Sequence, residues 1–241
     1  MAYALGFVIA VAIGLTGVGA GTLTTPLLIL ALGVPARIAV GTSLIFGAVV
    51  KVITSPVYMA RGQVHWRTLF YMLAGGVPGV LIGVFLLHGV DGKVITGIIG
   101  ATIVIVAVFN LVRPAPEHRY DKTKWLALIA LPIGAEVGFS SAGAGALGAL
   151  SLLSLTQLPA AAVVGTDLVF GLVVSTIGGG VNAAAGTVDK VILMQLLAGG
   201  VPGALAGAYF AGKLPSKPLK MGLSVAMALL GANLVYRGFL R

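Results

Sequence analysis

Three charged residues lie inside long apolar stretches of the sequence, away from any polar loop: Lys51, Glu136 and Asp167. A charge near the centre of a bilayer costs at least about 2.5 kcal/mol, so each of these residues should face protein or water and serve a purpose. A buried ammonium group can bind an anion, and a carboxyl group in a low-dielectric cavity can carry a proton. The structural alternative is a Lys51–Asp167 or Lys51–Glu136 ion pair that only pins helices together.

Each of these charges belongs to a polar stripe with helical spacing. The first stripe consists of Ser43, Gly47, Lys51 and Thr54, which share one face of a helix. The corresponding residues later in the chain are Asp167, Gly171, Ser175 and Gly178. A third stripe, made of Glu136, Ser140 and Gly143, leads into a glycine-rich stretch. The first two stripes therefore carry single charges of opposite sign.

Two glycine-rich stretches interrupt the apolar runs. The first holds Thr16, Gly17, Gly19 and Gly21, and the second holds Ser140, Ser141, Gly143 and Gly145. Each glycine costs a helix interior about 1 kcal/mol relative to alanine, and unwound backbone in hydrocarbon lacks hydrogen-bond partners. We therefore expect helix breaks that line a polar cavity or a ligand. The half-helix that follows each break presents free N–H groups and a positive dipole end, which favour an anion.

Hydroxyl groups near these stretches have two interpretations. Thr42 and Thr166, with Ser140 and Ser141, could donate hydrogen bonds to a bound anion. They could equally hold neighbouring helices together.

The elements that must position these residues are membrane helices. The chain has 241 residues, of which 59% are hydrophobic and 9% are charged, whereas soluble domains average about 25% charged residues. Several apolar runs exceed the roughly 18 residues of a membrane span, and they are continuous rather than alternating. The sequence thus predicts an all-α integral membrane protein. Its net charge of +9 is assigned to Lys and Arg in short loops rather than to nucleic-acid binding.

Enzymatic chemistry is not indicated. The absence of cysteine excludes disulfides and thiolate metal sites from this chain. No nucleophile–base pair is recognisable, and the histidines share no metal-ligand spacing. We therefore expect no catalytic residue, no metal and no cofactor.

The sequence repeats itself at an offset of 124 residues. About two in five of the positions over residues 14–86 are identical to the position 124 residues later, far beyond shared apolar composition. We predict two repeats, 1–112 and 125–241, joined by the polar linker 113–124 into one membrane domain. Each repeat should hold four apolar segments, at about 2–32, 36–60, 67–88 and 92–112, then 124–156, 159–184, 189–211 and 216–238.

The first segment of each repeat has an awkward length. As one helix it would be roughly 45–50 Å long, too long for one span and too short for two. It is therefore either one broken span or a re-entrant hairpin of two half-helices.

Loop charge bears on this choice. The basic loop 61–67 corresponds to 185–191, which carries only Asp189 and Lys190, while the neutral loop 89–93 corresponds to the basic stretch 213–217. The basic side thus changes between repeats, as in inverted repeats, which need an odd number of crossings each and favour the hairpin. A parallel arrangement of eight spans gives the same total charge bias and stays open. In the inverted arrangement, one interface holds both tryptophans, Trp66 and Trp125.

Taken together, these motifs resemble the sulfite exporter TauE/SafE family, also called TSUP. The resemblance rests on Gly17-x-Gly19-x-Gly21 with Pro26, Ala39-Val40-Gly41-Thr42-Ser43, Gly62-Gln63-Val64-His65-Trp66-Arg67 and Gly75-Gly76-Val77-Pro78-Gly79. It covers nearly the whole chain and implies a multi-pass inner-membrane transporter of small sulfur-containing anions. The chain departs from the family pattern at Asp167, where serine is usual, and at His65, where an acidic residue is usual.

We therefore predict a secondary transporter that exports sulfite, thiosulfate or an organosulfonate by alternating access, with proton coupling as an option. The expected substrate-binding residues are Thr16, Gly17, Gly19, Gly21, Thr42, Ser43, Lys51, Ser140, Ser141, Gly143, Gly145 and Thr166. The expected proton carriers are Asp167 and Glu136. The alternative function is a cation- or proton-conducting pore that uses Glu136 and Asp167. The expected partners are the sulfur-containing anion and the lipid bilayer, not nucleic acid, and a homodimer is compatible with this interpretation.

Overall fold

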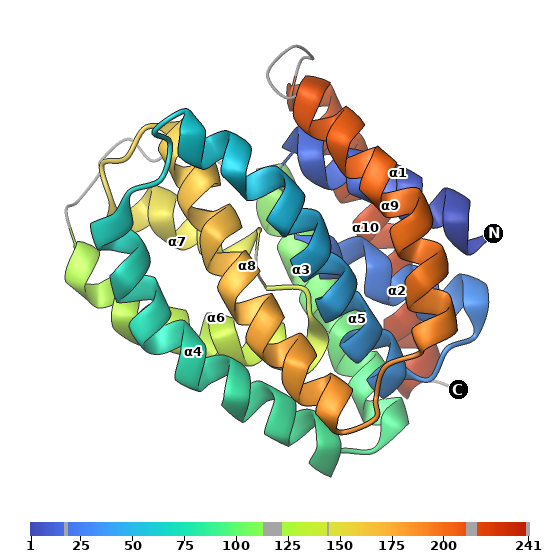
Figure 1. Ribbon diagram of the computed structural model, residues 1–241. Coiled ribbons are helices and arrows are strands. Elements are labelled where there is room, and N and C mark those ends of the chain that lie inside the picture. Colours follow the sequence, from blue (N-terminus) through green and yellow to red (C-terminus); the bar gives the residue numbers. More distant parts are fainter. Residues whose placement is uncertain (17–18, 113–121, 144, 211–215, 240–241) are drawn as a thin grey trace.

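The computed structural model describes residues 1–16, 19–112, 122–143, 145–210 and 216–239, and every regular element in them is a helix (Figure 1). The first half contains α1 (Ala2–Thr16), α2 (Ala20–Leu32), α3 (Ala36–Ala60), α4 (Trp66–Gly89) and α5 (Gly92–Val112). The second half contains the short 3-10 helix η1 (Thr123–Trp125), α6 (Leu126–Ser140), α7 (Leu147–Leu155), α8 (Ala160–Ala184), α9 (Lys190–Phe210) and α10 (Ser216–Phe239). The predicted all-α class is confirmed.

Within the described residues, six helices are long and apolar enough to cross a membrane: α3, α4, α5, α8, α9 and α10. The other α-helices have 15, 13, 15 and 9 residues. A helix of 15 residues is about 22 Å long, which is less than the roughly 30 Å hydrocarbon core. The chain is therefore a multi-pass membrane protein. The first segment of each half is broken as predicted, because α1 ends at Thr16 before α2 begins at Ala20, and α6 ends at Ser140 before α7 begins at Leu147.

The broken segment of the second half folds back on itself. The backbone N–H of Lys122, just before η1, donates a hydrogen bond of 2.9 Å to the carbonyl of Leu155, the last residue of α7. Figure 1 shows the N-terminus and the end of α2 on the same side of the molecule. These contacts favour the hairpin alternative over a single broken span.

The two halves exchange packing partners. Helix α4 packs on α6 of the other half, and α9 packs on α1. The carbonyl of Ala127 occupies the place where a side chain at Gly75 of α4 would project. The equivalent Gly199 of α9 faces the carbonyl of Tyr3 in the same way. Both pairs are related by the same 124-residue offset. Each half thus completes the packing of the other.

Glycines spaced four residues apart make this close packing of helices possible. In α4 they are Gly75, Gly79 and Gly83, which face the carbonyls of Ala127, Leu131 and Ala135. In α9 they are Gly199, Gly203 and Gly207, which face the carbonyls of Tyr3, Phe7 and Val11. Small residues at this spacing let the backbones of membrane helices approach closely.

Helices α3 and α8 occupy corresponding positions in the two halves, pack together and run in opposite directions (Figure 1). Thr42, near the start of α3, accepts a hydrogen bond of 3.1 Å from the N–H of Asp189, just after α8. Thr166, near the start of α8, accepts one of 3.0 Å from the N–H of His65, just after α3. Opposite directions are what inverted repeats require. Whether the halves are inverted across a membrane stays a prediction.

Candidate functional site

The two helix interruptions touch each other in the interior, although they are far apart in the sequence. Gly21, in the first turn of α2, lies against Ser141, and an added Cβ would collide with the carbonyl and hydroxyl oxygens of Ser141. The hydroxyls of Thr25 and Ser141 share a hydrogen bond of 2.5 Å, and both residues are buried. Ser141 has a φ of 64°, the only positive φ of a non-glycine residue in the described part of the chain. Such left-handed backbone concentrates at functional sites.

A carboxyl group lies next to this contact. The hydroxyl of Ser140, which is fully buried, donates a hydrogen bond to Glu136 and accepts one of 3.1 Å from the N–H of Ala142. A Cβ on Gly143 would overlap Glu136 Oε2, so glycine at this position leaves room for the carboxyl group. Glu136, Ser140 and Gly143 therefore lie together, although α6 ends at Ser140 and Gly143 belongs to the turn that follows it.

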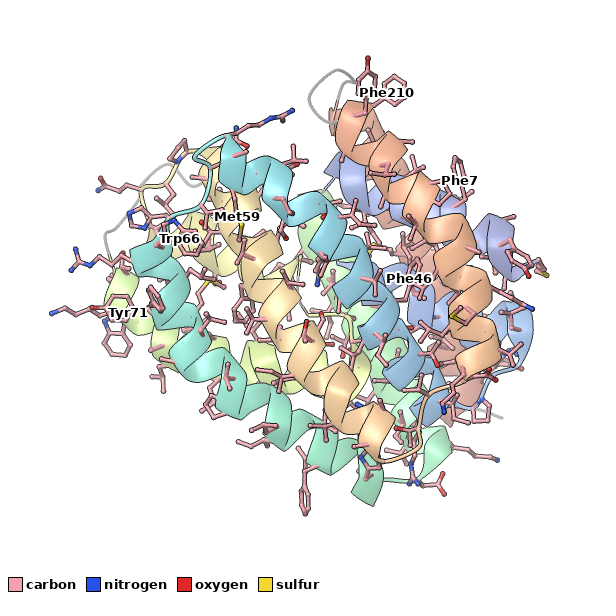
Figure 2. The ribbon with its side chains drawn as sticks, in the orientation of Figure 1. Phe7, Phe46, Met59, Trp66, Tyr71 and Phe210 are labelled. Atoms are coloured by element: carbon pink, nitrogen blue, oxygen red, sulfur yellow. The ribbon has the colours of Figure 1, made fainter. Side chains whose placement is uncertain are left out.

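The cation of the first stripe lies between α3 and α8, because its hydrogen-bond partner Ser175 belongs to α8. Phe46 of the same helix α3 points instead toward α9 (Figure 2). Lys51 is 3% exposed, and its Nζ donates a hydrogen bond of 3.2 Å to Ser175 Oγ. Asp167 is near enough for its charge to act on Lys51. One turn before Lys51, Gly47 faces Ala20, which is the first residue of α2. Lys51 therefore lies on α3 one turn beyond the contact with the start of α2.

The N-terminus of α2 has no side-chain cap. Its N-cap residue, Gly19, has no side chain, and the hydroxyls of Thr22 and Thr24 turn back to the carbonyls of Gly19 and Ala20. The first N–H groups of a helix have no partner within the helix and carry its positive dipole end. Ser43 Oγ, in the stripe of Lys51, is buried without a hydrogen-bond partner among the described residues. This part of the site can therefore offer donors to an anion.

The corresponding place in the second half already contains a negative charge. Asp167 is 2% exposed, and its Oδ1 lies where a Cβ on Gly148, in the first turn of α7, would be. In the first half the residue that corresponds to Asp167 is the neutral Ser43. A carboxylate close to the start of a helix interacts favourably with the positive dipole end. The two half-helix ends are thus electrostatically different.

Several of the predicted binding residues do not join this cluster. Thr42 and Thr166 lie near the loops, where their hydroxyls already accept backbone hydrogen bonds. Gly145 has a φ of 103° in the turn before α7, a conformation that suits glycine. Gly17 and the side chain of Thr16 lie outside the described residues.

Two contacting residues are absent from the sequence-based site: Thr25 and Ser175. A signal for each was present, because Thr25 follows Gly21 by one helical turn and Ser175 belongs to the stripe of Asp167. Thr25 corresponds to Ala149 in the second repeat, so a search for duplicated polar residues passes over it.

The chemistry available to this cluster is binding and proton transfer. Lys51, hydroxyl groups and the uncapped half-helix can hold an anion, and the carboxyl groups of Glu136 and Asp167 can carry protons. In the part of the chain that the structure describes, no three His, Asp or Glu side chains come together as a metal site would need.

Comparison with known proteins agrees with a transport role. The model of a family described as Sulfite exporter TauE/SafE matches residues 2–234. The "Probable membrane transporter protein YjnA" of Bacillus subtilis (strain 168) is 27% identical over 248 residues, covering 96% of this chain and 97% of that protein. A "Probable membrane transporter protein" of Xylella fastidiosa (strain Temecula1 / ATCC 700964) is 28% identical, covering 87% of this chain and 83% of that protein. No solved structure is significantly similar to the chain.

Proposed function

Because the chain belongs to the sulfite exporter TauE/SafE family and is a multi-pass membrane transporter, we propose that it exports a small sulfur-containing anion. The cargo is sulfite, thiosulfate or an organosulfonate, and the mechanism is alternating access. The observation that carries this proposal is the meeting of two interrupted helices beside a buried lysine. Half-helix ends at the membrane midplane are the usual means by which transporters hold anions.

The anion binds on the α2 side of this cluster. There it meets the uncapped N–H groups after Gly19, the hydroxyl of Ser43 and the ammonium group of Lys51. On the α7 side, Asp167 takes the place of a substrate anion and keeps a second anion away. The anion therefore has one binding place in the chain, on the α2 side. Thr42 and Thr166 act indirectly, by holding the loops at the ends of α3 and α8.

The packing of the helices is compatible with alternating access. One group consists of α1, α2, α3 and α9, and the other consists of α4, α6, α7 and α8, while α5 and α10 pack on each other outside both groups. The groups meet mainly where α3 packs on α8 and where Gly21 touches Ser141. A rocking of one group against the other opens the anion site first to one side and then to the other.

Proton coupling uses the two buried carboxyl groups. Glu136 lies beside the Ser141 contact, and the charge of Asp167 acts on Lys51, so a proton on either group changes the charge near the bound anion. Protonation of Asp167 leaves Lys51 with its positive charge uncompensated and strengthens anion binding.

Anion flux into proteoliposomes tests this proposal. Lys51→Met should lower the flux of the best substrate among sulfite, thiosulfate, sulfoacetate and taurine by at least about tenfold, because a charge-assisted hydrogen bond is lost. Lys93→Met removes an exposed lysine at the start of α5 and should leave flux unchanged. Equal flux in the two variants would remove Lys51 from the site. A current driven by a proton gradient without any sulfur-containing anion would instead support the pore that uses Glu136 and Asp167.

A further inference from the structure

A second candidate site lies at the loop end of the molecule, away from the two interruptions. It is a cavity of about 470 Å³ between the start of α4, the start of α6 and the residues after α7. Pockets for small ligands typically measure about 300–1,000 Å³. Its wall includes two buried threonines, Thr68 and Thr156, and its rim includes exposed side chains. The cavity is therefore large enough for a small organic ion.

The lining of this cavity is cationic. Arg67, Lys122 and Lys124 contribute to it, and no described lining residue is acidic. Arg67 lies in the first turn of α4, and Lys122 and Lys124 immediately precede α6, so two positive helix ends meet here. The negative end of α7 is partly satisfied, because the hydroxyl of Thr156 bonds to the carbonyl of Leu152. The three cationic side chains and the two helix N-termini favour an anionic ligand.

Aromatic residues place the cavity at the level of lipid headgroups. Trp125, which is 58% exposed, and Tyr71 line it. Trp and Tyr gather at the interface between bilayer and water, and lysines or arginines beside them contact phosphate groups.

The residues that α4 contributes to the cavity are not repeated in α9, the corresponding helix of the second half. Arg67 corresponds to Val191 in the second repeat, and Tyr71 corresponds to Gln195. None of the residues that line the cavity belongs to the contact between α2 and Ser141 or to the surroundings of Lys51, so the cavity is separate from the proposed transport site.

We propose that the cavity binds a tetrahedral oxyanion group, phosphate or sulfonate, at the membrane interface. The guanidinium of Arg67 suits bidentate contact with two oxygens, and Lys122 and Lys124 add point charges. The group has two sources, an anionic phospholipid headgroup or a free anion in solution. The proposal does not depend on which solute the chain transports.

The chain contains its own probe for this binding. Its two tryptophans are Trp66 and Trp125, so Trp66→Phe leaves a single fluorophore on the cavity wall. In phosphatidylcholine nanodiscs, titration with sodium sulfate at constant ionic strength should change Trp125 fluorescence saturably. Adding Arg67→Gln and Lys124→Gln together should weaken the apparent affinity by at least about tenfold. The matched control, Arg61→Gln, removes an exposed charge just after α3 that does not line the cavity.

Nanodiscs that also contain phosphatidylglycerol separate the two sources. A saturable response in phosphatidylcholine that persists with phosphatidylglycerol identifies a site for free anions. A sulfate response that phosphatidylglycerol suppresses at the same ionic strength identifies the headgroup as the occupant. No saturable change in phosphatidylcholine, or the same change in the double variant, would overturn the proposal. Lys51→Met should leave this titration unchanged even if it abolishes transport, so the two proposals fail independently.

Discussion

Replacing Gly21 by alanine should force the two helix interruptions apart. In the structure, the new methyl group would overlap the carbonyl carbon, the carbonyl oxygen and the hydroxyl of Ser141. A serine hydroxyl can rotate away, but a backbone carbonyl cannot. Ser141 is held in its left-handed conformation and bonded to Thr25, so α2 or the turn after α6 has to move.

The size of the effect follows from three contributions. Adding a methyl group to a well-packed interior costs about 1–3 kcal/mol. Loss of the Thr25–Ser141 hydrogen bond costs about 0.5–1.5 kcal/mol more, whereas alanine gains up to about 1 kcal/mol over glycine as a helix former. The expected net destabilisation is therefore about 0.5–3.5 kcal/mol, and anion flux should fall because the N–H groups of α2 are displaced.

Gly180→Ala is the matched control, since a Cβ on this exposed residue of α8 has no atom within 4 Å. We expect it to keep wild-type flux and an apparent Tm equal to or above that of the wild type. Thermal unfolding in detergent and anion flux into proteoliposomes should be measured for both variants. If Gly21→Ala behaves like Gly180→Ala in both measurements, α2 does not pack against Ser141, and the site does not include this contact.

Two further predictions concern the loops and the proton. Thr42→Val and Thr166→Val should each destabilise the protein by about 1 kcal/mol, because each removes the acceptor of a loop N–H; unchanged apparent Tm values in both would contradict a role in holding the loops. Glu136→Gln keeps an oxygen that can accept the Ser140 hydrogen bond but cannot exchange a proton, so flux should no longer respond to a proton gradient. An unaltered response would exclude Glu136 as a carrier.

Much of the fold could be predicted because the governing signals are local. Runs of apolar residues defined the long helices closely, and α3 and α5 begin and end where the predicted segments 36–60 and 92–112 do. The helix breaks were predictable because closely spaced glycines, three at the first break and two at the second, disfavour a helix. The length of the apolar run could not decide between a hairpin and a single broken span. The contact between Lys122 and Leu155, which favours the hairpin, is not visible in the sequence.

The candidate site was less predictable because it depends on contacts across the repeats. The one-turn spacing of Glu136 and Ser140 on α6 was enough to place these two together, whereas Gly143 reaches Glu136 only because the chain turns after Ser141. The bond between Thr25 and Ser141 joins residues 116 positions apart, which no periodicity reveals. Thr42 was expected near the anion on the strength of a motif, but a motif does not say which backbone group a hydroxyl bonds.

The cationic cavity was not predicted either. Its lining comes from three separate stretches, around Arg67, Lys122 and Gln157. Each stretch taken alone has the composition of an ordinary basic or polar loop. They come together only because the hairpin formed by α6 and α7 has both of its ends next to the start of α4.

The exchange of packing partners has a consequence for how the chain is made. A ribosome releases α4 before α6, so the second hairpin finds its partner as soon as it emerges. Helix α1 is released first but packs on α9, which is synthesised only after α8; at 5–20 residues per second, this delay lasts roughly 10–40 s. During that interval α1, which is too short to cross the membrane, lacks its main packing partner, so we expect this helix to depend on insertion factors during synthesis.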